Sequence, residues 1–191
     1  MKLKNIGLLS VLFYLFVVFA FFANALHESY PDEFDNILGG WNILHGVLPY
    51  SGFFTHHGPI PYFIASFIEI FSGQSFVRFR LIYAFFLLVI TFATYFFLKK
   101  RIGEKELSFY PFFIVFLGIV STYYWTHMLL ADNLAAFTFL PSYALIVLKA
   151  IYKKRTSLAD VAIVSVLSSI GLYSSLTYIY LFIFVHLAVL Y

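Results

Sequence analysis

The side chains best suited to chemistry gather in one polar stretch of an otherwise apolar chain. Four of the nine acidic residues lie between positions 28 and 35, and a pair of histidines follows in the same stretch. Carboxylates close to a membrane surface suit a general base, which takes a proton from a reacting group, or a hard divalent cation. We expect these groups to share one pocket with an acid from a later loop. The members of this expected pocket are Asp32, Glu33, Asp35, His56, His57 and Asp132.

Each of these residues also has a plainer interpretation. Asp32 follows a proline at the start of a helical pattern, and Asp132 precedes an apolar run, so each could serve only as a helix N-cap. Asp32 and Glu33 could also be first-turn acids that complement the helix dipole. Adjacent histidines in a loop are more often ordinary polar residues than ligands. Arg78 and Arg80 stand at the outer end of an apolar run, where arginine side chains usually reach for the membrane surface. An arginine fork in that place also suits a lipid-linked phosphate.

The composition indicates a membrane protein. Hydrophobic residues make up 62% of the 191 residues and charged residues 11%, which leaves too little polar surface to cover a soluble globule. There is no cysteine, so a disulfide framework or a thiolate metal site is excluded. Ten of the twelve Lys and Arg residues lie at the ends of apolar runs, so the basic charge reports membrane topology rather than nucleic-acid binding. They are Lys2 and Lys4; Lys99, Lys100, Arg101 and Lys105; and Lys149, Lys153, Lys154 and Arg155.

The apolar runs predict an all-α integral membrane protein with about six transmembrane helices, since about 20 helical residues cross a hydrocarbon core of roughly 30 Å. Basic residues before the first run place the N-terminus in the cytoplasm and the loop 27–74 outside the plasma membrane. The first run could instead be a secretory signal peptide, because Ala23-Asn24-Ala25 has the form of a cleavage site, but the run is longer than the apolar part of such peptides. The expected spans are 6–26, 75–98, 107–124, 133–151, 158–172 and 175–191.

Two short amphipathic helices are expected in the outer loop. The first begins at Asp32, has apolar residues at spacings of three and four, and stops at Gly46. It would lie on the outer membrane surface with Trp41 among the lipid headgroups. The second runs from Pro59 to about Gly73 and is too short to cross a bilayer. Glu69 on this second helix is expected to be solvated.

The chain ends inside an apolar run, with no basic cluster after it. We therefore expect these residues to be the N-terminal part of a longer protein, and we expect the fragment by itself to be inactive.

Several motifs between Pro31 and Arg80 resemble the N-terminal signature of the GT-C glycosyltransferases. They are Pro31-Asp32-Glu33, Gly46-Val-Leu-Pro49-Tyr50, His56-His57-Gly58-Pro59-Ile60-Pro61-Tyr62 and Phe71-Ser-Gly73-Gln-Ser-Phe-Val-Arg78. The family includes the protein O-mannosyltransferases, the aminoarabinose transferase of lipid A and bacterial enzymes of the dolichyl-phosphate-mannose-mannosyltransferase type. The chain departs from the aminoarabinose transferases at His56-His57-Gly58-Pro59, where they have Glu-Lys-Pro-Pro, so donor and metal preferences are not carried over. The family's C-terminal spans and soluble domain are not among these residues.

The resemblance implies a hexosyltransferase that moves a sugar from a polyprenyl-phosphate carrier to a hydroxyl of a lipid, glycan or protein at the extracytoplasmic face of the bilayer. It implies that Asp32 acts as the base on the acceptor and that Asp132 matches a second acid. Glu33 and Asp132 would orient the acceptor or hold an ion, and a divalent metal ion would have Asp32 and Asp132 as ligands. Arg78 or Arg80 would steady the phosphate. The substrate-binding candidates are Asp35, His56, His57, Arg78 and Arg80.

Two other classes stay open. A transporter or lipid flippase usually has ionisable groups or broken helices at mid-membrane and shows internal repeats, whereas here the acids and arginines lie at span ends. A non-catalytic membrane scaffold would use Asp32 and Asp132 merely as helix caps.

Overall fold

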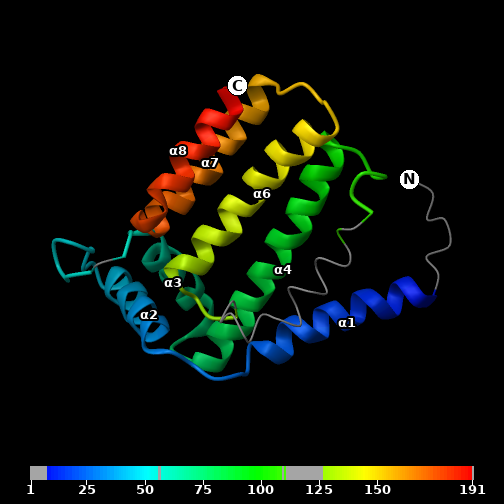
Figure 1. Cartoon of the computed structure of the whole chain (residues 1–191). Helices are drawn as coiled ribbons and strands as arrows, with labels where there is room; N and C mark the ends of the chain where they lie inside the picture. The colour runs from blue at the N-terminus through cyan, green and yellow to red at the C-terminus, as the bar shows by residue number, and fades with distance from the viewer. Residues whose placement is uncertain (1–7, 56, 109, 111–126, 191) are drawn as a thin grey trace.

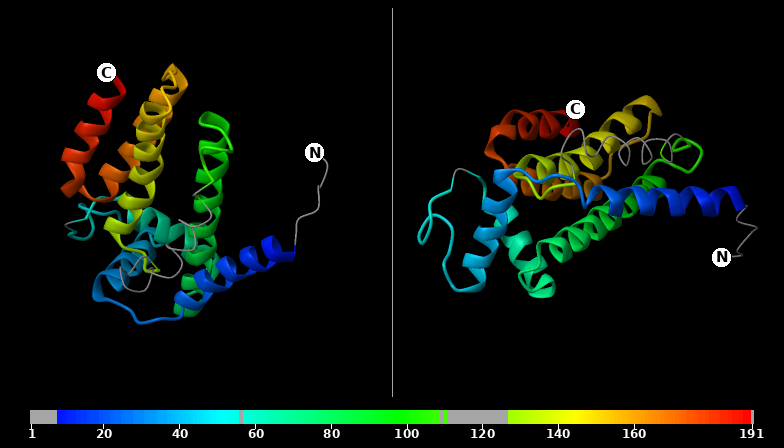
Figure 2. Two further views of the ribbon diagram at one scale, coloured as in Figure 1. Left: turned by 45° about the vertical axis from the view of Figure 1, so that its right-hand side comes forward. Right: turned by 90° about the horizontal axis from the view of Figure 1, so that it is seen from below.

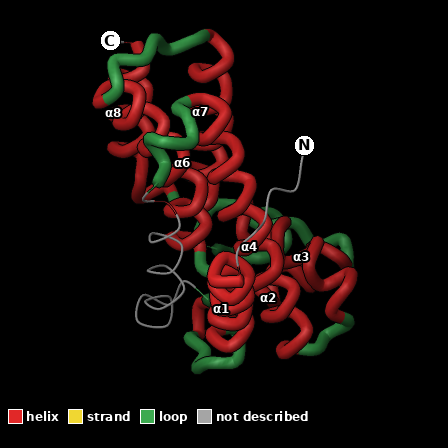
Figure 3. The backbone as a smooth tube through the Cα atoms, turned by 90° about the vertical axis from the view of Figure 1, so that its right-hand side faces the viewer, coloured by secondary structure: helices red, strands yellow, loops and turns green. Residues whose placement is uncertain are grey.

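The computed structural model describes residues 8–55, 57–108, 110 and 127–190. Within these ranges the chain folds as helices joined by loops and contains no strand, which confirms the all-helical class (Figure 3). The helices are α1 (Leu8–Asn24), α2 (Pro31–Leu44), α3 (Ile60–Ser72), α4 (Phe76–Arg101), α6 (Ala131–Ile151), α7 (Leu158–Ser174), the short 3-10 helix η1 (Leu176–Tyr178) and α8 (Ile179–Leu190).

Four helices, α4, α6, α7 and α8, lie side by side as a bundle (Figures 1 and 2). Two of the described helices, α4 with 26 residues and α6 with 21, are long and apolar enough to cross a membrane. The other apolar helices, α1, α3, α7 and α8, are shorter. The expected span 107–124 falls almost wholly outside the described residues. The count of about six spans therefore stays a prediction.

Helix α1 runs at a steep angle to this bundle rather than along it (Figures 1 and 2). Its buried residues Val17 and Phe21 lie in its C-terminal half, whereas Phe19 is largely exposed. The carbonyl of Ala25, just after the helix, accepts a hydrogen bond from Arg80 on α4. The buried residues of α1 thus lie toward its C-terminal end, and in its N-terminal half Tyr14 contacts Phe92 of α4.

Both short helices expected between residues 27 and 74 are present as α2 and α3. Helix α2 begins at Pro31, one residue earlier than predicted, because a proline at the first helical position has no N–H to leave unsatisfied. The expected stops are also found. Gly46 and Gly73 have φ angles of 81° and 56°, in the left-handed region that ends many helices and that glycine enters without steric cost.

The contact between α2 and α3 depends on two adjacent glycines. A Cβ atom on Gly40 would lie 2.6 Å from the Ala65 Cβ and 2.6 Å from the Ser66 backbone nitrogen, and one on Gly39 would overlap the ring of Tyr62. Small residues allow two helix backbones to approach this closely. The close approach buries Gly39 and Gly40 against α3.

The two faces of α2 are arranged opposite to those of a helix in a soluble protein. Glu33, Asn36 and Gly40 share one face at spacings of three and four, and this face is buried. Phe34 and Leu38 lie on the other face and are exposed. The exposed apolar stripe is the one expected to meet lipid, and the buried polar stripe makes its contacts inside the protein.

The opposite end of the bundle is held by a buried ionic cluster. The Asp160 carboxylate accepts hydrogen bonds from Lys149 of α6 and, at 2.6 Å, from Arg101 of α4. Ser157 and Asp160 also form a reciprocal capping box at the start of α7. These contacts join three helices at the end of the bundle that carries the basic clusters.

Candidate functional site

The three acids of the first turns of α2 have different surroundings. Successive residues of a helix are 100° apart, so neighbours in sequence point to different faces. Asp32 is half-buried, Glu33 is fully buried and Asp35 is exposed. The N-cap of α2 is Tyr30, which makes no side-chain capping hydrogen bond. Asp32 is therefore not the N-cap, but it lies in the first turn of α2, where an acid complements the helix dipole.

Glu33 forms a buried ion pair with Arg80, and both side chains are almost inaccessible, at 0% and 1% exposure. The Arg80 Nε–H donates to Glu33 Oε1 at 3.0 Å, and Nη2 donates to Oε2. The other N–H groups donate to the backbone carbonyls of Ala25, His27 and Glu28. An arginine has five N–H donors, so the guanidinium group is saturated. It has no donor left for a phosphate, and Glu33 is neutralised by its partner.

Asp35 belongs to a second polar network, which joins α2 to α3. The buried Tyr62 hydroxyl donates to Asp35 Oδ2 at 3.1 Å and also contacts Thr55 Oγ1. Burial raises the pKa of Tyr62, so its hydroxyl stays a donor at every physiological pH. The backbone N–H of His57 donates to Thr55 Oγ1 at 3.1 Å. The structure thus connects Asp35 to the backbone of His57 through Tyr62 and Thr55, while His56 lies outside the described residues.

Asp132 stands in the first turn of α6, at the second helical position, as Asp32 does in α2. The N-cap of α6 is Leu130, again without a side-chain capping bond, so the N-cap interpretation of Asp132 is also wrong. The side chain is exposed, and its charge acts on the nearby Tyr178 hydroxyl of η1. No described residue donates a hydrogen bond to Asp32 or Asp132 or forms an ion pair with either.

Two hydrogen bonds bring the segment before Asp132 against the segment that carries Asp32. Asn36 Nδ2 donates to the carbonyl of Leu129 at 2.9 Å, and His127 Nε2 lies 3.1 Å from the carbonyl of Glu28. The start of α6 and helix α2 therefore lie at the same end of the bundle (Figure 1). The two acids with no described partner share this end.

Sequence reasoning missed Asn36, although a signal was present. Glu33, Asn36 and Gly40 recur at spacings of three and four, which is a helical stripe of polar and small residues. In a membrane such a stripe faces protein rather than lipid.

Arg78 differs from its neighbour Arg80. Its side chain is exposed and forms no ion pair with any residue in the described ranges. Its backbone N–H is donated to Ser75 Oγ, which caps α4. Of the two arginines that were expected to steady a phosphate, Arg78 is the one whose N–H groups are available.

The described donors do not form a ready metal site. Across the part of the chain that the structure describes, no three His, Asp or Glu side chains lie close enough to hold an ion. Ca²⁺ and Mg²⁺ prefer about six or more oxygen ligands, of which Asp32 and Asp132 could supply only some. A metal role for these two acids stays a prediction.

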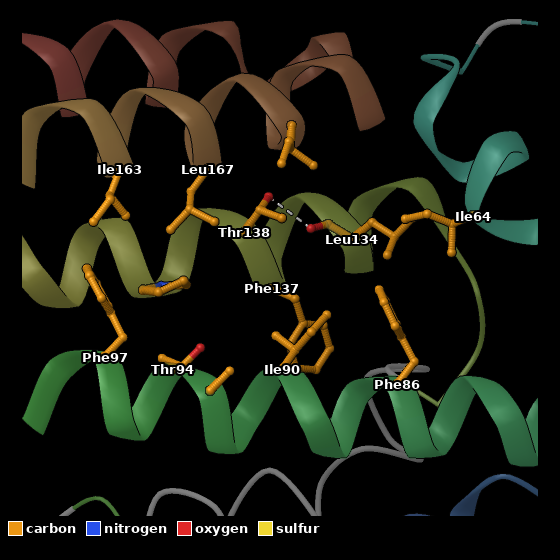
Figure 4. Close-up of a pocket in the computed structure, with 13 residues that line it drawn as sticks. Ile64, Phe86, Ile90, Thr94, Phe97, Leu134, Phe137, Thr138, Ile163 and Leu167 are labelled. Atoms are coloured by element: carbon orange, nitrogen blue, oxygen red, sulfur yellow. Dashed lines mark hydrogen bonds between the residues drawn. The ribbon is translucent and has the colours of Figure 1, made fainter. Parts of the chain in front are cut away.

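An apolar cavity of about 450 Å³ begins near this end of the bundle and extends toward the other end, between α4 on one side and α6 and α7 on the other (Figure 4). Leu134, which lies two residues after Asp132, lines one end together with Phe86, and Phe97 lies toward the other end. A second apolar cavity between α3 and α4 shares Ile64 and Phe86 with the first. The polar end of the protein therefore continues into space that suits a hydrocarbon chain.

Glu69 was expected to be solvated, and this prediction is wrong. Its side chain is 8% exposed, because α3 packs closely between α2 and α4. Burial raises the pKa of Glu69 to about 7, and the nearby His45 opposes part of that rise. Glu69 is therefore partly protonated near neutral pH.

Replacing Glu69 with glutamine should stabilise the protein in alkaline solution. Between its ordinary pKa of 4.5 and about 7, the folded chain keeps a proton that the unfolded chain releases, so stability falls as pH rises through this window. With allowance for solvent screening, the gain in unfolding free energy for Glu69→Gln above about pH 8 should be about 1–2 kcal/mol. Thermal unfolding in detergent should show this gain vanish near pH 4.5. The exposed Glu28→Gln is the control, and an equal gain at all pH values would contradict the assignment.

These features define a class: an all-helical protein with membrane-length apolar helices and two helix N-termini that present acids without described partners at one end of the bundle. Comparison of the chain with protein-family models, curated proteins and solved structures finds no match. The resemblance to the GT-C glycosyltransferases rests on the motifs in the sequence and stays a prediction.

Proposed function

We propose that this chain is part of a membrane glycosyltransferase that takes a sugar from a polyprenyl-phosphate carrier and passes it to a hydroxyl acceptor at the extracytoplasmic face. The observation that carries the proposal is the contrast among the acids. Glu33 is neutralised by Arg80, whereas Asp32 and Asp132 have no described partner at the same end of the bundle. Acids without partners are available to a substrate.

In the proposed reaction Asp32 is the general base. Its carboxylate takes the proton of the acceptor hydroxyl as the oxygen attacks the anomeric carbon of the donor sugar. The bond between that carbon and the phosphate oxygen breaks, and polyprenyl phosphate leaves with the electron pair. This is a single inverting displacement. A phosphate leaving group needs little protonation, so one base and nearby positive charge suffice, and the base contributes on the order of 10²–10⁴-fold.

The other residues take roles that follow from their contacts. Arg78 supplies positive charge beside the phosphate, because the N–H groups of Arg80 are all engaged. Asp132 orients the acceptor hydroxyl. Glu33 holds Arg80 and so fixes the start of α2, which makes it a positioning residue rather than a group that touches the acceptor. Asp35 accepts a hydrogen bond from Tyr62, and the backbone of His57 lies in the same network, so neither side chain takes a step in the proposed displacement.

The apolar cavities support a lipid-linked donor. The cavity between α4, α6 and α7 begins at Leu134, two residues after Asp132, and is lined almost wholly by hydrocarbon side chains. A prenyl tail lying there would leave its phosphate at the polar end of the bundle. A transporter is less well supported, because α4 and α6 carry no Asp, Glu, Lys, Arg or His between positions 81 and 98 or between 133 and 148.

Arg78→Ala should weaken use of the donor. Loss of a charged hydrogen bond to phosphate should raise the donor KM about tenfold or more, with a smaller change in kcat. The measurement is transfer of a radiolabelled sugar from polyprenyl phosphate to acceptor by the full-length protein in detergent. Lys100→Ala, at the other end of α4, is the control, and its donor KM should be close to that of the natural protein. The proposed function fails if the full-length protein transfers no sugar from any polyprenyl-phosphate donor, or if uptake by proteoliposomes occurs without a donor.

A further inference from the structure

The buried amide of Asn36 takes no part in the proposed transfer of the sugar. Asn36 is fully buried on α2, and its Nδ2 donates to the Leu129 carbonyl, 93 positions away in the sequence. A carbonyl oxygen can only accept, so the NH₂ group of the amide must be the part that faces Leu129. The Oδ1 atom is buried without a hydrogen-bond partner. An unpaired buried acceptor destabilises a fold, so the favourable contact of this side chain is the bond to Leu129.

Leu129 lies in a short buried segment that leads into α6. Met128 and Leu129 are 1% and 0% exposed, and Leu130 has an extended backbone. Carbonyls just before a helix are outside its hydrogen-bond ladder, so when buried they need donors from elsewhere. Asn133 Nδ2 donates to the Met128 carbonyl at 3.1 Å, and Asn36 donates to the next carbonyl. Asn133 belongs to α6 itself, whereas Asn36 joins the segment to α2.

Asn36 stands between the two acids that have no described partner. It lies four residues after Asp32 on the same helix, so the two share a face about one turn apart. The carbonyl that it binds belongs to the residue three positions before Asp132. One rigid amide thus connects the helix that carries one acid to the segment that starts the helix of the other.

We propose that Asn36 is the positioning residue of the site, whose hydrogen bond to Leu129 sets the separation of Asp32 and Asp132. The consequence for catalysis rests on the proposed glycosyl transfer, in which both carboxylates must reach one hydroxyl. The geometric claim is independent of that function. Each can therefore be tested without the other.

The geometric claim is tested by a distance measurement. The 191 residues contain no cysteine, so cysteines placed at the exposed positions Leu38 on α2 and Ala136 on α6 can carry the only two spin labels. We expect the label-to-label distance distribution, measured by pulsed electron resonance, to shift or broaden in Asn36→Ala. Asn42→Ala, the same change on the same helix at a half-buried site with no described side-chain partner, should leave it unchanged.

The catalytic consequence is tested in the full-length protein. Asn36→Ala should lower kcat about tenfold or more with the donor KM unchanged, because a misplacement of the reacting groups by about 1 Å can cost about a hundredfold in rate. The same change in an Asp132→Asn background should have little further effect, since both act through Asp132. General loss of folding would instead lower activity equally in both backgrounds. Asn36→Gln, which keeps the amide, should restore part of kcat.

An unchanged distance distribution in Asn36→Ala overturns the inference, whether or not sugar transfer is detected. A changed distribution in a protein that transfers no sugar from any donor supports the positioning role and counts against the proposed function. If Asn36→Ala gives no folded protein, Asn36→Leu decides, because leucine has nearly the same shape but no hydrogen-bond donor. It should give the same shift in distance.

Discussion

Replacing Asp32 with asparagine should lower the rate of sugar transfer by at least about a hundredfold, because asparagine keeps the size of the side chain but cannot take a proton. Helical content and insertion into membranes should persist, since Asp32 neither caps α2 nor pairs with any described residue. Initial rates with saturating donor and acceptor, compared between the two full-length proteins, measure the effect. The loss should appear in kcat, because a base acts in the transition state.

Asp35→Asn is the matched control for this prediction. Asp35 has the same side chain on the same helix, but it accepts a hydrogen bond from Tyr62, and an asparagine oxygen can accept that bond as well. Its turnover should change only a few-fold. Near-normal turnover of Asp32→Asn would remove Asp32 from the mechanism, and an equal loss in both variants would show that the assay responds to charge on α2 in general.

Removing one member of the Glu33–Arg80 pair should cause the largest loss of stability in the chain. Breaking a buried ion pair leaves an uncompensated charge in a nonpolar surrounding and costs about 3–5 kcal/mol. Arg80→Met should lower the free energy of unfolding more than Glu33→Gln, since it also removes the hydrogen-bond donors to the carbonyls of Ala25, His27 and Glu28. Arg80→Lys should keep only part of the stability that Arg80→Met loses, because an ammonium group cannot reproduce the forked hydrogen bonds of a guanidinium group.

Arg78→Met is the control, since this arginine is two residues away on the same helix but is exposed and has no described ion pair. Its unfolding free energy should stay within about 0.5 kcal/mol of the natural protein. Thermal unfolding in detergent, followed by circular dichroism, measures all four variants. If Arg80→Met unfolded at the same temperature as Arg78→Met, the pair would not hold the start of α2, and the role assigned to Glu33 would be lost with it.

The limits of α2 and α3 could be predicted because their signals are local. Pro31 has a fixed φ angle suited to a first helical turn, and Gly46 and Gly73 adopt the left-handed conformation at the ends of the two helices. The N-caps of α2 and α6 are Tyr30 and Leu130, two residues before the expected caps, so Asp32 and Asp132 lie inside the first turns of their helices. This difference matters because the carboxylate of an acid that is not the N-cap is not used for the capping hydrogen bond and can make other contacts.

The amino-acid sequence by itself determined the all-helical class, the apolar segments and the stretch in which the acids would gather, since hydropathy and helix-ending residues act over a few positions. Only the tertiary structure decided which acid is available. Glu33 meets Arg80 across 47 positions, and Asn36 meets Leu129 across 93. Adjacent acids on a helix point 100° apart. Which acid finds a partner therefore depends on which face of α2 packs against the bundle. That choice depends on Gly40 meeting Ala65, a contact between helix backbones that no local pattern specifies.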